Sequence, residues 1–298
     1  MKMKKLIVML LTLAMVFSLA ACGNKNDNTG ASVESKEATS ESPAASKAAD
    51  ASKAPEESDK LTLEEGKLKV GMEIGYPPFE YFDTDGSTPI GFDVQLGKAL
   101  ADKLGLEVDY VDTAWDGIFA GLNTDKYDVI ISAVTITPER LEEFNFTKPY
   151  IGNAQALVLL KDTEITAKSL EECAGLKVGY QAETTTDYYM TKLKEEGLDI
   201  KEKEYEKVIN VFDDLDLGRI DAIVCDSVVA LDYVNAENSK FQIVWQGTAD
   251  ETFGVCIKKG NDALTAKLDA ALAEIKAEGK LTEISMDIFK MDLTKDVK

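Results

Sequence analysis

Histidine is absent from this sequence of 298 residues. Its absence excludes a Ser-His-Asp or Cys-His catalytic arrangement and every zinc site with a histidine ligand. Basic residues are scarce relative to acidic ones, 33 lysines and arginines against 54 aspartates and glutamates, so the net charge is −21. Such a surface repels nucleic-acid phosphates, and we expect no nucleic-acid partner. The apolar fraction of 45% is enough for a sizeable core in about two domains.

Long apolar runs are also scarce. Residues 6–21 form one behind three lysines, and it is too short to span a bilayer comfortably, so residues 1–21 are predicted to be a signal peptide. The run ends Leu-Ala-Ala-Cys-Gly at 19–23, which resembles the lipobox of a bacterial lipoprotein. We therefore expect Cys22 to be lipidated and to anchor the protein on the extracytoplasmic face of the cell membrane. A plain signal peptide with an incidental cysteine is the alternative.

Residues 22–61 contain mostly alanine, serine, glutamate, lysine, asparagine and aspartate. Such a composition does not offset the entropy lost on folding, so a flexible tether is predicted. Beyond it remain Cys173, Cys225 and Cys256, an odd number without Cys-x-x-Cys spacing. Small buried apolar residues are favoured over a disulfide, although a pair stays open, and no metal cluster is indicated.

The rest of the chain alternates β-branched runs with helical patterns. Apolar residues fall four apart in 92–104 and 264–275, as expected for helices packed on a core. The predicted strands are residues 68–72, 108–111, 128–134, 156–161, 177–180, 222–225, 242–245 and 255–258. This alternation predicts an α/β fold with largely parallel sheets, in one large domain or in two lobes.

Ligands of open α/β sheets bind beyond the carboxyl ends of the strands, so the residues that follow each strand are the candidates for a site. After 128–134, Thr137 and Pro138 predict the start of a helix whose first turn carries Arg140. A cation at the positive end of a helix is unfavourable by some tenths of a kcal/mol. A bound anion, held by Arg140 and the Thr135 hydroxyl, compensates it. A salt bridge to Glu142 or Glu143 is the alternative.

Other strand ends carry matching groups. The segment 181–187 is rich in threonine and predicts a second anion-binding helix start, with ordinary N-capping as the alternative. Asp226 follows the strand 222–225 and either receives an ammonium or caps the next helix. Glu73 and Tyr76 follow the first strand, and Trp115 opens a helix as a ligand cover or a core residue. An arginine with hydroxyls, a carboxylate and aromatic walls together fit a free α-amino acid.

At this point the chain resembles the polar amino-acid-binding proteins of ABC importers, solute-binding family 3. The resemblance covers about residues 62–290 and follows the order of motifs 68–79, 91–94, 115–117, 127–140, 144–150, 177–185 and 218–226. It implies a two-lobed periplasmic-binding fold of type II, with the ligand in the cleft between the lobes. The two hinge crossings are expected near 150–153 and 250–254, giving lobe 1 as 62–151 plus 252–298 and lobe 2 as 152–251.

The resemblance also implies roles. Arg140 is expected to bind the ligand carboxylate, helped by Thr135, Thr185 and the backbone of Ala133, and Asp226 to bind the α-ammonium. Tyr76 and Trp115 are expected to pack the ligand, and Glu73 and Gln181 to face its side chain. Relatives often have glycine where this chain has Glu183, which puts the backbone approach of lobe 2 in doubt.

The expected function is binding of a polar amino acid and its delivery to an ABC permease, by a monomer without cofactor, metal or catalytic residues. Glu73 offers a carboxylate to the ligand side chain, which favours a cationic or hydrogen-bond-donating group. Because Glu73 together with residues 115–117 resembles the cystine-binding branch of the family, cystine ranks first, then arginine or lysine, then glutamine. A binding-fold enzyme such as a cyclic-acid dehydratase is the main alternative, with Glu73 or Glu183 as its acid. A sensor or adhesin is the other.

Overall fold

The computed structural model describes residues 60–295 and residue 297. The predicted signal peptide, the lipidated Cys22 and the tether up to residue 59 lie outside the described residues. Within the described part of the chain, no helix combines the length and the apolar character that a membrane crossing requires.

Five strands form a first sheet in the order β4-β1-β5-β14-β6. The first three run parallel, β14 is antiparallel to β5, and β6 is antiparallel to β14. The strands are β1 (Lys67–Met72), β4 (Glu107–Asp112), β5 (Val129–Ile130), β6 (Phe144–Phe146) and β14 (Cys256–Lys258). Because β14 comes from far along the chain, the polypeptide leaves this sheet and later returns to it.

A second sheet repeats the pattern in the order β10-β9-β11-β8-β12. Its first three strands are parallel, and β8 is antiparallel to both β11 and β12. The strands are β8 (Gln155–Leu160), β9 (Lys177–Gln181), β10 (Lys201–Tyr205), β11 (Ala222–Asp226) and β12 (Phe241–Gln246). Each sheet is thus mixed, because one strand, β14 in the first sheet and β8 in the second, runs opposite to the other four.

Helices bury both faces of each sheet, which explains the apolar runs of the strands. In the first sheet, Val129 and Ile131 join the core under α1, α7 and α8, whereas Ile130 joins the core under α2. In the second, Ala156 and Val158 face α5 and α6, and Leu157 faces α4. The helices are α1 (Phe92–Leu104), α2 (Ile118–Asn123), α3 (Pro138–Glu143), α4 (Thr185–Glu195), α5 (Val208–Asp216), α6 (Ser227–Asn235), α7 (Asp262–Ala277) and α8 (Lys280–Phe289), with 3₁₀ turns η1 (Trp115–Gly117) and η2 (Glu171–Cys173).

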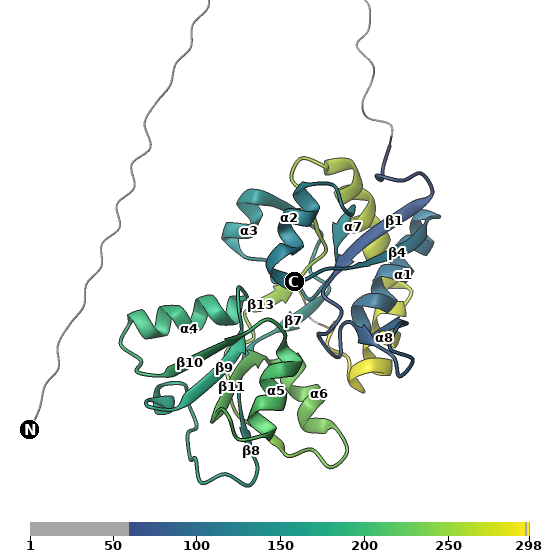
Figure 1. Ribbon diagram of the computed structural model, residues 1–298. Helices are drawn as coiled ribbons and strands as arrows, with labels where there is room; N and C mark the ends of the chain where they lie inside the picture. The colour runs from purple at the N-terminus through teal and green to yellow at the C-terminus, as the bar shows by residue number, and fades with distance from the viewer. Residues whose placement is uncertain (1–59, 296, 298) are drawn as a thin grey trace, which may run out of the picture. The chain divides into compact units, whose positions relative to one another are not determined.

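Two short strands connect the sheets. β7 (Ile151–Asn153) and β13 (Glu251–Phe253) pair antiparallel, and every strand of the second sheet lies between them in the sequence. Figure 1 shows them side by side between the two sheets and their helices. The fold is therefore the predicted two-lobed α/β arrangement. A further hairpin joins β2 (Tyr81–Phe82) to β3 (Pro89–Ile90).

The structure confirms some of the predicted helix and strand features and contradicts others. The apolar stripes of α1 and α7 are buried and the Thr137 side chain caps α3 as predicted. The predicted strand 128–134 is wrong after Ile130, because the backbone turns at Ala133, which has a φ of 45°. The charged strand β10 was not predicted, since it pairs only at the sheet edge. The three cysteines 173, 225 and 256 are buried free thiols.

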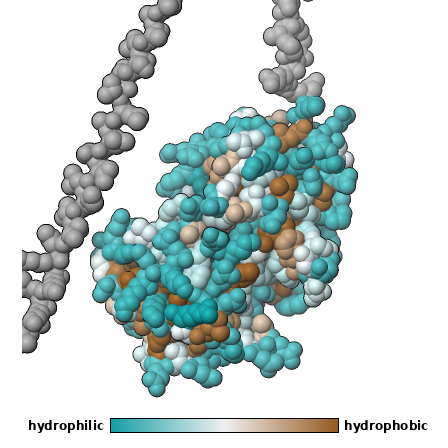
Figure 2. Space-filling model, in the orientation of Figure 1, coloured by the Kyte–Doolittle hydropathy of each residue, from teal (hydrophilic) through white to brown (hydrophobic). Residues whose placement is uncertain are grey.

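The surface agrees with the acidic composition. In Figure 2, hydrophilic residues cover most of the visible face and apolar residues form separate patches. Large exposed apolar side chains occur on different elements, namely Leu63, Phe82, Leu141, Tyr188, Leu217, Met286 and Met291. Single apolar side chains of this kind are normal on a globular protein.

Candidate functional site

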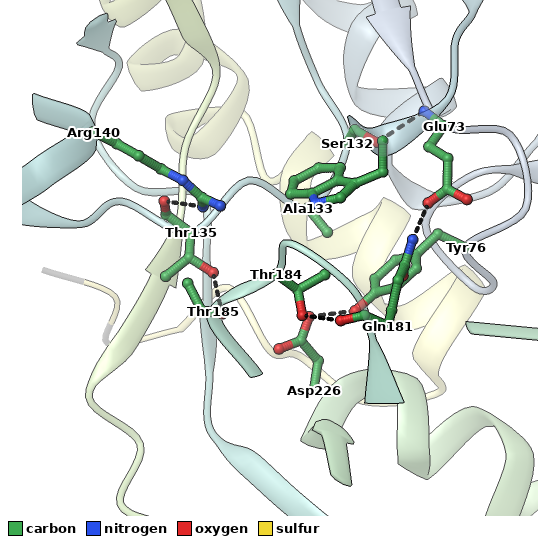
Figure 3. Close-up of a pocket in the computed structure, with 11 residues that line it drawn as sticks. Glu73, Tyr76, Ser132, Ala133, Thr135, Arg140, Gln181, Thr184, Thr185 and Asp226 are labelled. Carbon is green, nitrogen blue, oxygen red and sulfur yellow. Dashed lines mark hydrogen bonds between the residues drawn. The ribbon is translucent and has the colours of Figure 1, made fainter. Parts of the chain in front are cut away.

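A pocket lies between the two sheets, at the carboxyl ends of their parallel strands. It encloses about 320 Å³ of space, part of it open to solvent. Eleven residues line it: Glu73, Tyr76, Trp115, Ser132, Ala133, Thr135, Arg140, Gln181, Thr184, Thr185 and Asp226. The structure thus brings together all nine predicted ligand-binding residues and adds Ser132 and Thr184, each adjacent in sequence to a predicted residue (Figure 3).

Arg140 lies at one end of the pocket. Its backbone N–H donates to the Thr137 hydroxyl, which fixes the start of α3, and its Nη1 donates to the Thr135 carbonyl at 2.9 Å. The guanidinium carbon lies 5.0 Å from the centre of the Phe119 ring and 5.7 Å from that of Trp115. Within residues 60–295, Arg140 forms no salt bridge, so the predicted alternative of a pair with Glu142 or Glu143 is wrong. The guanidinium is left with donors for an anion.

The segment after β9 faces Arg140 from the second lobe. Thr184 caps α4 by accepting from Asp187 N–H, so Thr185 occupies the first helical position with its hydroxyl 3.5 Å from that of Thr135. Glu183 adopts a φ of 59°, the left-handed conformation that glycine adopts most readily. A non-glycine residue there costs on the order of 1–3 kcal/mol. The Glu183 carbonyl accepts from Trp115 Nε1 at 3.0 Å, so this turn contacts the first lobe.

Asp226 lies at the opposite side of the pocket and is 6% exposed. It occupies the N-cap of α6 without capping it, so that predicted alternative is wrong. Its carboxylate accepts from Tyr76 Oη at 2.6 Å, Asn153 Nδ2 at 2.7 Å and Gln155 Nε2 at 3.4 Å. Burial, followed by repulsion from Glu251, raises the pKa of Asp226 to about 7. A cation beside this carboxylate relieves both costs.

Sequence reasoning missed the groups behind Asp226. Asn153 Nδ2 donates both to Asp226 and to Glu251 Oε2, the latter at 2.7 Å, and Gln155 Nε2 donates to Glu251 Oε1 at 3.1 Å. Asn153 and Glu251 face each other across β7 and β13. No local sequence signal marks these residues, because only the pairing of two distant strands places them at the site.

Glu73 and Gln181 form a third side of the pocket. Gln181 Nε2 donates to Glu73 Oε2 at 2.9 Å and to the Glu206 carbonyl at 3.0 Å, so its amide hydrogens are used. Glu73 Oε1 and Gln181 Oε1 are buried without a hydrogen-bond partner. Burial raises the pKa of Glu73 to about 7, although the Gln181 hydrogen bond and the nearby Lys207 ammonium oppose the shift. The pocket therefore contains two buried acceptor oxygens without a hydrogen-bond donor, and the one on Glu73 belongs to an ionisable carboxyl.

Contacts across the pocket hold the two lobes together. Tyr76 to Asp226, Glu73 to Gln181 and Trp115 to Glu183 are hydrogen bonds between residues of the first and second lobes. Lys207 Nζ also joins the lobes by donating to the Ile74 carbonyl at 3.2 Å, and the Thr135 and Thr185 hydroxyls meet across the pocket at 3.5 Å. The described residues contain no cluster of three histidine, cysteine or acidic side chains suited to a metal ion. The site offers charges and hydrogen bonds to a small polar molecule.

Comparisons with known proteins agree with this geometry. The model of the bacterial extracellular solute-binding proteins, family 3, matches residues 68–291. The chain is 36% identical over 233 residues to the L-cystine-binding protein TcyJ of Escherichia coli (strain K12), covering 78% of this chain and 86% of that protein. It is 32% identical to the ABC transporter arginine-binding protein 1 of the same strain, covering 74% and 89%. An ancestral arginine-binding protein bound to arginine superposes with a TM-score of 0.71 at 37% identity, covering 75% of this chain and 98% of that one.

Proposed function

Because the chain belongs to the bacterial extracellular solute-binding proteins, family 3, we propose that it binds one free polar amino acid in the pocket and delivers it to an ABC import permease. The proposal depends on two groups that line the same pocket from different lobes. Arg140 has no carboxylate partner among the described residues, and Asp226 is a buried carboxyl. These groups match the two ends of an amino-acid zwitterion. Each relative named above is itself described as an amino-acid binder.

The α-carboxylate is proposed to lie against Arg140. The guanidinium fork suits bidentate binding of a carboxylate, and the hydroxyls of Thr135 and Thr185, 3.5 Å apart, line the same pocket. The backbone N–H at the start of α4 adds partial positive charge from the second lobe. Ala133, at the turn after β5, lines the same pocket, but its N–H donates to Asp93 and is not free for the carboxylate.

The α-ammonium is proposed to bind Asp226. With a pKa of about 7, this carboxyl is partly protonated at neutral pH. An ammonium favours its charged form and lowers that pKa. Tyr76 then packs the ligand with its ring while its hydroxyl holds Asp226.

The ligand side chain is proposed to carry hydrogen-bond donors and a positive charge, because it must satisfy Glu73 Oε1 and Gln181 Oε1. Lysine, arginine and the distal ammonium of cystine meet this requirement, and glutamine meets it without the charge. Cystine is also favoured by Lys207, which does not line the pocket but acts on Glu73 and donates to the Ile74 carbonyl; we propose that the distal carboxylate of cystine reaches its ammonium. We rank cystine first, then arginine or lysine, then glutamine.

Closure follows from differential contact. Arg140 belongs to the proposed lobe 1 (62–151 and 252–298) and Asp226 to the proposed lobe 2 (152–251), with β7 and β13 as the hinge strands. A ligand that touches both residues favours the closed arrangement by its difference in affinity for the closed and open states. A closed, loaded monomer is the form that the permease is proposed to recognise.

The membrane association is proposed to depend on Cys22, lipidated after removal of residues 1–21, with residues 22–61 as the tether. Replacing Cys22 by alanine is expected to release the protein from the membrane fraction of the producing cell. Retention of the variant in that fraction would show that another element anchors it.

An enzyme remains the alternative class, because the buried Glu73 with a pKa of about 7 has the properties of a general acid. A dehydratase would convert a cyclic carboxylate, whereas a binding protein releases its ligand unchanged. Mass spectrometry of L-cystine, L-arginine and a cyclic hydroxy acid incubated with the protein separates these classes.

A thermal-shift screen of the twenty amino acids with cystine and ornithine tests the proposal. A ligand that binds only the native state stabilises it by about 2.7 kcal/mol at a concentration 100 times its Kd. We expect cystine or a basic amino acid to raise the melting temperature most and aspartate to leave it unchanged. No shift with any of these compounds would contradict the proposed function.

A further inference from the structure

Four buried side-chain oxygens among the described residues have no hydrogen-bond partner. Two belong to Glu73 and Gln181, which line the pocket and await the ligand. The other two are Glu80 Oε2 and Asp93 Oδ1, on side chains that are 0% exposed and do not line the pocket. Because these two oxygens are buried away from the pocket lining, they need a partner inside the protein.

The remaining oxygens of this pair hold the pocket wall. Glu80 Oε1 accepts from Ser132 Oγ at 2.6 Å, and Ser132 Oγ in turn accepts from Glu73 N–H at 3.0 Å. Asp93 Oδ2 accepts from Ala133 N–H at 2.6 Å and from Tyr150 Oη at 3.0 Å. Both acids therefore support the Ser132–Ala133 turn, whose left-handed φ at Ala133 is one that residues other than glycine rarely adopt.

The surroundings of the two buried carboxyls, Glu80 and Asp93, decide which of them carries the negative charge. Burial and then the negative charge of Asp93 raise the pKa of Glu80 well above its ordinary value, and burial raises the pKa of Asp93 to about 7. Asp93 is better suited to hold the negative charge, since it accepts two hydrogen bonds and lies in the first turn of α1. The other titratable groups that act on the pair are Glu73, Tyr110 and Tyr150, and none of these three supplies a positive charge.

We infer that Glu80 and Asp93 share one proton, with Glu80 Oε2–H donating to Asp93 Oδ1, and that this pair positions the Ser132–Ala133 turn for ligand binding. The proton satisfies both orphaned oxygens and leaves a single negative charge on the pair. It also completes a chain of hydrogen bonds from Glu73 N–H through Ser132, Glu80 and Asp93 to Ala133 N–H. The shared proton does not depend on the proposed function. Only the positioning role of the pair rests on the proposed function.

Infrared spectroscopy of the ligand-free protein tests the proton directly. At about pH 8, above the pKa of about 7 of both Glu73 and Asp226, wild type is expected to show the C=O stretch of an un-ionised carboxylic acid. The band is expected to disappear in Glu80→Gln and to persist in Glu204→Gln, a control at the exposed strand β10. Identical carboxylic-acid bands in wild type and Glu80→Gln would overturn the shared proton.

Calorimetry with L-cystine and L-arginine tests the positioning role. In Glu80→Gln the introduced amide donates to Asp93 and accepts from Ser132 without titrating, so this variant is expected to keep Kd within about threefold, whereas Glu80→Ala weakens binding at least about tenfold. Equal loss in both variants, or none in Glu80→Ala, would overturn this role. If Glu80→Ala does not fold, Glu80→Gln still decides, because a tenfold loss in it contradicts the inference. If wild type binds neither amino acid, the proposed function fails while the infrared result stands.

Discussion

Replacing Asp226 by asparagine keeps the shape of the side chain and removes its charge. In Asp226→Asn the side-chain carbonyl still accepts from Asn153 and Gln155, but the new amide turns donor hydrogens toward the place of the ligand ammonium. Losing one partner of a desolvated charged contact costs about 2–5 kcal/mol, or roughly 30-fold to several thousand-fold in Kd. Isothermal titration calorimetry with L-cystine and L-arginine at neutral pH measures the loss.

Stability of the ligand-free protein provides the internal check. Because the pKa of Asp226 is raised in the folded state, ionising it opposes folding as pH rises from about 4 to about 7. Asp226→Asn removes this cost, so its melting temperature is expected to equal or exceed that of wild type at pH 7. Asp213→Asn, which removes an exposed charge from α5 in the same lobe, serves as the control for net charge. Unchanged affinity in Asp226→Asn would refute the assignment of the ammonium site.

Three further predictions concern the other ends of the ligand. Arg140→Ala is expected to weaken both amino acids at least about tenfold in calorimetry, because no other cation lines the pocket within the described residues; an affinity within twofold of wild type would exclude Arg140 as the carboxylate partner. Lys207→Met is expected to weaken L-cystine but not L-arginine, whereas the exposed Lys192→Met control leaves both unchanged; parallel losses for the two ligands would contradict a distal carboxylate at Lys207. Lowering the pH from about 8 to about 6 is expected to weaken L-arginine binding, because Glu73 and Asp226 each have a pKa of about 7 and must be ionised to bind the ligand. In Glu73→Gln, the number of protons released on binding is expected to fall by half. The same pH dependence of affinity in wild type and Glu73→Gln would exclude Glu73 as a group that must ionise.

Much of the pocket could be predicted because its residues follow strand ends. Parallel strands converge at one edge of a sheet, so Glu73, Gln181 and Asp226 were marked by position as well as by chemistry. Arg140 was marked by an unfavourable place at a helix start. Arg140 lines the pocket and forms no salt bridge to Glu142 or Glu143. The unfavourable place of a cation at a helix start therefore correctly indicated a residue of the pocket.

Other parts could not be predicted because their cause is tertiary. Asn153 and Glu251 look like ordinary strand residues, and they reach Asp226 only through the pairing of β7 with β13. The run 128–134 has the composition of a strand, yet Asp93 captures the Ala133 N–H and the chain turns. Strand β10, Lys-Glu-Lys-Glu-Tyr, lacks an apolar face because it lies at a sheet edge.

The central claim is that charges on the two lobes hold the two ends of one zwitterion. Calorimetry of wild type with ligands that lack one end tests it most directly: N,N′-diacetyl-L-cystine against L-cystine, and agmatine, which lacks the carboxylate, against L-arginine. The account predicts that each modified compound binds at least about 30-fold more weakly than its parent. A modified compound that binds as tightly as its parent would contradict it.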